Sequence, residues 1–170
     1  SEMCIRDSNN LNYDVDQIVV STGAKQSIAN VCMSLINKGD EVLIPTPYWV
    51  SYSAMVELAE GVPVFINPDK DSNYKITAQQ LDSAITDKTK MLMLNSPNNP
   101  SGSVFTEQEY LEFSKVLLKY PNIIIVSDEI YEHINYGVKS VSFASLPGMY
   151  DRTVTVNGIS KAYAMTGWRI

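Results

Sequence analysis

The feature that most constrains the fold is a regular alternation of short apolar runs with amphipathic stretches. The runs at residues 90–94, 122–126 and 153–156 are apolar or β-branched almost throughout, without the alternation of a strand that has one face in water. Helical patterns separate these runs. Strands buried on both faces and alternating with helices form a parallel sheet that is covered on each side. The sequence therefore predicts an α/β fold, a three-layer αβα sandwich with a mainly parallel sheet and right-handed crossovers.

The remaining segments extend this pattern. Further strands are expected at residues 16–21, 41–44 and 62–66. Helices are expected from residue 24 to a glycine cap at Gly39, and at residues 50–60, 77–85 and 106–119. Thr77 and Thr106 are predicted N-caps, and Thr106 has capping-box spacing with Glu109.

Composition limits the classes of function. At 170 residues the chain can form one large core but not two full-sized domains. The net charge of −6 argues against binding to nucleic acid through phosphate contacts, and no apolar run approaches the roughly 20 residues that span a bilayer. Two cysteines and a single histidine, His133, provide neither a disulfide framework nor a metal cluster or triad. With no secretory signal in the sequence, we expect a cytoplasmic protein.

Lys161 is the first candidate for chemistry. It follows the strand at residues 153–156 and the turn Asn157-Gly158, at the carboxyl end where open α/β sheets bind ligands. Apolar neighbours would remove water from its amine, lower the pKa and make it a nucleophile toward carbonyl groups. The structural alternative is a surface lysine whose stem lies along those neighbours.

Other strand ends carry similar candidates, each with a structural alternative. Asp128 follows a buried strand, where a carboxylate costs free energy unless a cation pairs with it; the alternative is a helix N-cap. The turn at residues 23–25 leads from a strand into a helix, so its free N–H groups can bind an anion, or it is an ordinary turn. Trp49 could belong to the core, and the proline-rich loop that carries Asn99 needs no function to exist.

Taken together, these segments resemble a known family. S-T-G-A-K-Q at residues 21–26, P-Y-W-V-S-Y at 47–52, N-P-x-G at 99–102 and S-K-A-Y-A-M-T-G-W-R-I at 160–170 are similar to the motifs of class I/II aminotransferases. These are fold-type I enzymes that use pyridoxal 5′-phosphate. The residues of the second and fourth motifs are most similar to those of the aspartate/aromatic branch. The resemblance implies that the chain forms an incomplete large, cofactor-binding domain of that fold.

The resemblance implies three catalytic residues. Lys161 would form a Schiff base with the cofactor and later move a proton between the substrate and the cofactor. Asp128 would keep the pyridine nitrogen protonated. Tyr131 would donate to the 3-oxygen of the cofactor, which favours the unprotonated Schiff base.

The resemblance also implies binding residues. Trp49 would lie against the cofactor ring and Asn99 would bind its 3-oxygen, and both would contact the substrate. The remaining cofactor contacts, mostly to the phosphate, are assigned to Gly23, Ala24, Lys25, Ser160 and Arg169. Many relatives carry a phosphate-binding serine where this chain has Gly158, so Ser160 is the candidate that would compensate.

The domain assignment follows from the same resemblance. Residues 13–170 are expected to be part of the large domain, and residues 1–12 receive no role. Because family members begin earlier and carry their substrate-carboxylate arginine further on, we expect a central fragment that is inactive when isolated. The expected partners are an amino acid and a 2-oxo acid, with a homodimer at full length and no nucleic acid or membrane.

Three alternatives to a transaminase stay open. A carbon–sulfur lyase or an aminocyclopropane-carboxylate synthase would share the same cofactor residues. A regulator that senses the cofactor without catalysis is less favoured, because no basic helix-turn-helix segment precedes Asp16 and the chain is acidic.

Overall fold

The middle layer of the fold is a five-stranded sheet in which every pair of neighbours is parallel. The computed structural model describes residues 9–170; residues 1–8, which include Cys4 and most of the segment without an assigned role, lie outside the described residues. The strand order is β2-β1-β3-β4-β5. The strands are β1 (Glu41–Pro45), β2 (Val62–Ile66), β3 (Thr89–Asn95), β4 (Ile124–Asp128) and β5 (Thr153–Val156).

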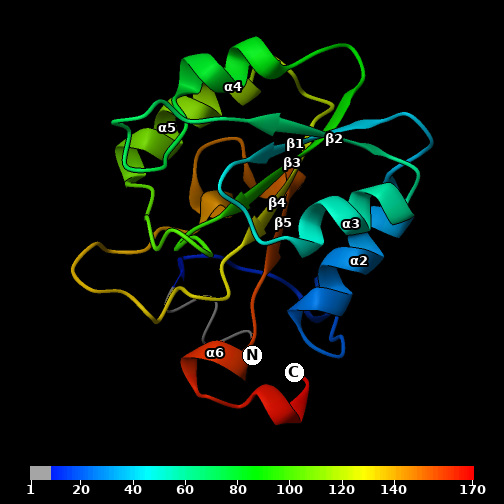
Figure 1. Cartoon of the computed structure of the whole chain (residues 1–170). Helices are drawn as coiled ribbons and strands as arrows, with labels where there is room; N and C mark the ends of the chain where they lie inside the picture. Colours follow the sequence, from blue (N-terminus) through cyan, green and yellow to red (C-terminus); the bar gives the residue numbers. More distant parts are fainter. Residues whose placement is uncertain (1–8) are drawn as a thin grey trace.

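Helices cover both faces of this sheet (Figure 1). The α-helices are α2 (Ala24–Leu35), α3 (Ser51–Leu58), α4 (Ala78–Ala84), α5 (Glu107–Leu117) and α6 (Ile159–Ala162). Short 3-10 helices are η1 (Val15–Gln17), η2 (Phe143–Ser145), η3 (Tyr150–Arg152) and η4 (Thr166–Trp168). Among residues 9–170, no helix has both the length and the apolar character needed to cross a membrane.

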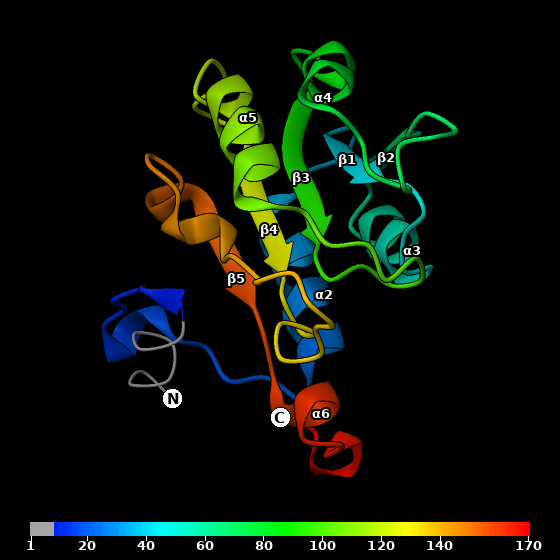
Figure 2. The same ribbon diagram turned by 90° about the vertical axis from the view of Figure 1, so that its left-hand side faces the viewer.

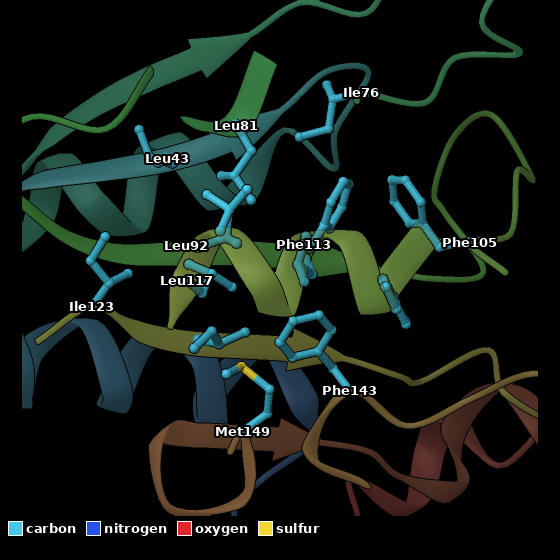
Figure 3. Close-up of a cluster of buried hydrophobic side chains, with 14 of the residues drawn as sticks. Leu43, Ile76, Leu81, Leu92, Phe105, Phe113, Leu117, Ile123, Phe143 and Met149 are labelled. Atoms are coloured by element: carbon cyan, nitrogen blue, oxygen red, sulfur yellow. The ribbon is translucent and has the colours of Figure 1, made fainter. Parts of the chain in front are cut away.

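Successive residues of a strand belong to two separate hydrophobic cores, because their side chains point to opposite faces of the sheet. Leu92 packs with α4 and α5 in one cluster, which Figure 3 shows around Phe113 and Leu117. Met91 and Met93 pack with α2 and α3 in the other. This two-sided burial confirms the predicted three-layer sandwich with a parallel sheet.

The predicted caps are present at the two helices on the Leu92 side. The Thr77 hydroxyl accepts a hydrogen bond from the Gln80 N–H, and the Thr106 hydroxyl accepts one from the Glu109 N–H. In both cases the third helical residue bonds back to the cap N–H, completing a capping box. Each cap is worth about 1 kcal/mol, and together they fix where α4 and α5 begin.

Two local predictions are wrong. Residues 16–21, expected as a strand, start in η1 and continue as extended chain that pairs with no strand of the described part. Val19 and Val20 are exposed there. β-Branched residues favour a strand mainly through packing against neighbouring strands, and these two side chains have no such neighbours in the described part of the chain. The first long helix ends at Leu35, before Gly39, which instead occupies a turn with a positive φ of 87°.

The strand order determines where a ligand can bind. The chain passes from β1 outward to β2, then returns across β1 to β3, so the order reverses beside β1. Crevices form at such points, at the carboxyl ends of the strands. In Figure 2 the arrowheads of β3, β4 and β5 all point toward the end of the molecule that carries α6.

Candidate active site

A cavity of about 290 Å³ lies at the carboxyl edge of the sheet. Its wall is built by the start of α2 and by the segments that follow β1, β3, β4 and β5. All the site residues nominated from the sequence line it: Gly23, Ala24, Lys25, Trp49, Asn99, Asp128, Tyr131, Ser160, Lys161 and Arg169. Residues far apart in the chain therefore meet in one place, while the role of each stays a prediction.

Asp128 is the buried carboxylate of the cavity. It is the last residue of β4 and only 5% exposed. Its Oδ2 accepts a hydrogen bond of 2.6 Å from the Tyr52 hydroxyl, and its Oδ1 accepts one of 3.2 Å from the Ile130 N–H. Burial raises the pKa of Asp128, while these two hydrogen bonds oppose the rise. A turn follows rather than a helix, so the helix N-cap alternative is wrong.

Asn99 and Tyr131 face each other across the cavity. The Asn99 side-chain amide lies 3.5 Å from the Tyr131 hydroxyl, at the limit of a hydrogen bond. Buried Asn95, at the end of β3, holds both segments: its amide donates to the Asp128 carbonyl and its oxygen accepts from the Asn99 N–H. Two hydrogen-bonding groups thus point at a common region beside Asp128.

Lys161 lies on the one-turn helix α6, with its Nζ 6.0 Å from the centre of the Tyr131 ring. Its side chain is exposed, and so are the neighbouring Tyr163 and Trp168. The expected desolvation of the amine by these apolar neighbours is therefore wrong for this structure. What the fold does provide is an amine near the ring of Tyr131, on the wall of the cavity.

The part of the cavity wall at the start of α2 is suited to an anion. Helix α2 starts at Ala24, and the Gln26 N–H donates to the carbonyl of the N-cap residue Gly23 at 3.0 Å. The N–H groups of Ala24 and Lys25 are the ones that a helix start leaves without a partner inside the helix. Arg169 lies beside this terminus, where its guanidinium donates to the Thr22 carbonyl at 3.3 Å. A Cβ on Gly23 would stand only 2.6 Å from Arg169 Nη2, so a side chain there would displace the end of the arginine from its present position, and the positive φ of 78° itself favours glycine.

Lys25 and Trp49 form the side wall. The Lys25 Nζ lies 5.0 Å from the centre of the Trp49 ring, a cation–π contact. The Trp49 ring in turn meets the ring of Tyr52 edge-on, at 5.4 Å between centroids. The indole is thus positioned by contacts on two sides.

The surroundings of Gly158 differ from what a serine at this position would need. A Cβ on Gly158 would lie 3.2 Å from both the Ile130 side chain and the Ile170 carbonyl, so this chain has little room for a serine there. The Ser160 hydroxyl donates to the Ile170 carbonyl at 3.3 Å, although the residue does line the cavity. His133 pairs with Glu132 at 3.3 Å and lies outside the cavity wall.

Sequence reasoning missed several residues of the wall: Tyr52, Asn95, Ile130 and Thr166. Tyr52 was part of a quoted motif; it lies in the first turn of α3, three residues after Trp49, whose ring it contacts edge-on. Asn95 is the polar residue that ends an apolar strand, a signal that could have been used.

Glu129, next to Asp128, is a second buried carboxyl group that the sequence did not nominate. It is 2% exposed, and its Oε1 accepts hydrogen bonds from Ser127, Ser142 and the Phe143 N–H. Burial raises its pKa from 4.5 to about 7, and the three donors only partly offset that rise. Glu129 does not line the cavity.

The sequence of the chain and this geometry match one protein family. Residues 3–170 match the family described as aminotransferase class I and II, and the chain belongs to that family. The membership predicted from the motifs is therefore confirmed, including the aspartate/aromatic branch.

Among similar proteins is a probable aspartate/prephenate aminotransferase of Rickettsia bellii, which is 52% identical over 95% of this chain. The crystal structure of the aspartate aminotransferase from Rhizobium meliloti superposes with a TM-score of 0.96 at 48% identity, covering 99% of this chain and 42% of that one. An aromatic aminotransferase from Pyrococcus horikoshii gives 0.95 at 39% identity, with 99% and 45% covered. The chain spans about 41% of the length of the Rickettsia protein.

The Tyr52 hydrogen bond yields a first prediction. Tyr52→Phe keeps the ring but removes the 2.6 Å donor, so the titration of Asp128 should move to higher pH. Carbon-13 NMR of aspartate-labelled protein, with the resonance assigned through Asp128→Asn, measures this. Tyr48→Phe is the matched control, because that hydroxyl pairs with Ser53 instead. An Asp128 titration that is the same in all three proteins would show that the contact has no electrostatic effect.

Glu129 yields a prediction for stability against pH. Because the pKa is higher in the folded state, folding binds a proton between pH 4.5 and about 7, and stability falls as the pH rises through that window. Glu129→Gln keeps an acceptor oxygen and removes the charge. As the pH rises from 4.5 to 8, the unfolding free energy of wild type should therefore fall by on the order of 3 kcal/mol relative to that of Glu129→Gln.

Urea denaturation at both pH values measures this difference. Glu57→Gln on α3 is the control, because that side chain is exposed. A Glu129→Gln variant whose stability follows the wild-type pH profile would mean that Glu129 does not titrate in this range.

Proposed function

We propose that this chain is the cofactor-binding part of a pyridoxal 5′-phosphate-dependent aminotransferase, which transfers an amino group between an L-amino acid and a 2-oxo acid. The observation that carries the proposal is the meeting, around one cavity, of an amine at Lys161, a buried carboxylate at Asp128 and an anion site at Arg169. In this assignment residues 13–170 belong to the large domain and residues 1–12 have no role.

The residues of the cavity fit this cofactor in chemical type. The buried Asp128, whose pKa is raised by burial, would be stabilised as a carboxylate by a cationic ring nitrogen. The start of α2 and Arg169 suit a phosphate group. Lys161 supplies the primary amine that attaches an aldehyde.

Pyridoxal 5′-phosphate, when bound, supplies an aldehyde that holds amino groups and a ring that accepts the electron pair left by the departing α-proton. Asp128 would keep a proton on the ring nitrogen, with the Tyr52 hydroxyl holding the carboxylate ionised. Lys161 Nζ would take the α-proton as a general base and return it as an acid. Its exposed side chain leaves it free to do both.

The other side chains would bind and orient. Tyr131 and Asn99, which face each other at 3.5 Å, would donate to the same oxygen of the cofactor. The Trp49 indole would cover one side of the ring, and Asn99 and Trp49 would contact the substrate. Gly23, Ala24 and Lys25, with Ser160 and Arg169, would hold the phosphate end.

The names of similar proteins support an acidic or aromatic amino donor. They are called aspartate, aspartate/prephenate and aromatic aminotransferases. We further propose a cytoplasmic enzyme that works as a homodimer at full length.

Stoichiometric conversion of a 2-oxo acid acceptor into its amino acid would distinguish transamination from a lyase, a synthase or a regulator.

The assignment of Lys161 is tested by chemical trapping. Borohydride reduction of the full-length protein with pyridoxal 5′-phosphate, followed by peptide mapping, should place the cofactor on Lys161. Lys161→Ala should abolish both this adduct and turnover, while Lys115→Ala, which loses only a surface ion pair with Glu112, should retain them. An adduct on another lysine would refute the role.

The assignment of Asp128 is tested by kinetics. Asp128→Asn should lower single-turnover transamination by about 100-fold or more, because loss of one charge-assisted contact at a developing charge costs on the order of 3 kcal/mol. Asp82→Asn is the control, since that carboxylate pairs with Lys119 on the surface. Near wild-type rates in Asp128→Asn would exclude the role.

A further inference from the structure

Glu129 occupies a central place beside the cavity without being part of its wall. Its main-chain N–H donates to the Val156 carbonyl of β5 at 2.8 Å, which continues the β4–β5 pairing by one residue. The backbone is thus fixed to the sheet between Asp128 and Tyr131, both of which line the cavity. Its side chain is almost fully buried and points to other partners.

Those partners come from both ends of one loop. The Ser127 hydroxyl, on β4, lies 2.7 Å from Glu129 Oε1. The Ser142 hydroxyl and the Phe143 N–H lie 2.9 Å and 3.1 Å from the same oxygen. One carboxyl oxygen therefore joins the start of the loop of residues 130–141 to its end.

The far end of this loop is anchored in the core. Phe143 is fully buried and meets the Tyr110 ring edge-on at 4.9 Å. Figure 3 shows Phe143 among the side chains of the cluster under α5. A bond from Glu129 to this point ties the loop to a rigid part of the molecule.

Tyr131 depends on this tie, because its own side chain is weakly held. The polar contact of its hydroxyl, with Asn99, is 3.5 Å long, and the following residues of the loop are mostly exposed. The position of the Tyr131 ring must therefore come from the backbone of the turn that Glu129 begins.

We propose that Glu129 is a positioning residue, which clamps the two ends of the loop of residues 130–141 and so sets Asp128 and Tyr131 in the cavity. The inference rests on the proposed function only where it concerns the cofactor; the clamp itself is a property of the protein alone. The raised pKa of Glu129 agrees with a carboxyl group that is kept buried despite its desolvation cost.

The experiment compares four variants of the full-length protein: Glu129→Ala, Glu129→Gln, Ser142→Ala and, as matched control, Ser145→Ala. Glu129→Gln retains an acceptor oxygen, and Ser142→Ala removes one donor to it. The Ser145 hydroxyl donates to the Ser142 carbonyl and, within residues 9–170, has no hydrogen bond to Glu129. Amide hydrogen exchange is measured without cofactor, at residues 130–133 and at β1 as an internal reference. Affinity for pyridoxal 5′-phosphate is measured separately.

We expect Glu129→Ala to exchange about tenfold faster at residues 130–133, because loss of the shared acceptor leaves the buried Ser142 hydroxyl and Phe143 N–H without their partner. Exchange in β1 should be unchanged, and cofactor affinity should fall by about tenfold. Ser142→Ala should show a smaller effect of the same kind. Below pH 7, where the Glu129 carboxyl group is protonated, Glu129→Gln should resemble wild type, and Ser145→Ala should do so at any pH.

Other outcomes overturn the clamp. They are unchanged exchange at residues 130–133 in Glu129→Ala, equal acceleration there and in β1, or faster exchange with unchanged cofactor affinity. If Glu129→Ala does not fold, Ser142→Ala decides by the same criteria. If wild-type protein binds no pyridoxal 5′-phosphate, the proposed function fails, and exchange at residues 130–133 alone judges the clamp.

Discussion

Burial of the sheet on both faces is the constraint on which the rest of this structure depends. Helices α2 and α3 cover one face and α4 and α5 the other, so the middles of the strands must be apolar. Charged and amide side chains are then favoured where strands end, as at Asn95 and Asp128. Because all five strands run in the same direction, their carboxyl ends share one edge of the sheet, and the cavity lined by polar groups lies at that edge.

The end of β4 shows how two adjacent carboxyl groups acquire different tasks. Successive residues of an extended chain point to opposite sides. Asp128 therefore points toward Tyr52, on the side of α3, while Glu129 points toward Ser142 and Phe143, on the side of α5. The first carboxyl group faces the cavity and the second holds the loop beside it. A one-residue shift of the strand would exchange these environments.

Much of this was predictable from sequence. Apolar runs and caps located the sheet and α4 and α5, and the motifs located every nominated cavity residue. The errors share a cause: residues 16–21 and Lys161 were judged by their local sequence, whereas pairing and burial depend on distant segments. Tyr52 was missed for the same reason, since it acts on a carboxylate 76 residues further along the chain. No local pattern encodes such a contact.

The cavity combines firmly and loosely held groups, and the difference follows from the elements that carry them. Asn95 and Asp128 end strands whose ladder bonds and buried side chains fix them. Lys161 stands on a single helical turn with an exposed side chain. In the proposed reaction the Asp128 carboxylate would stay beside the ring nitrogen of the cofactor, whereas the Lys161 amine would be released from the cofactor and move a proton. A strand end suits the first task because it is rigid, and a short helix suits the second because few contacts restrain it.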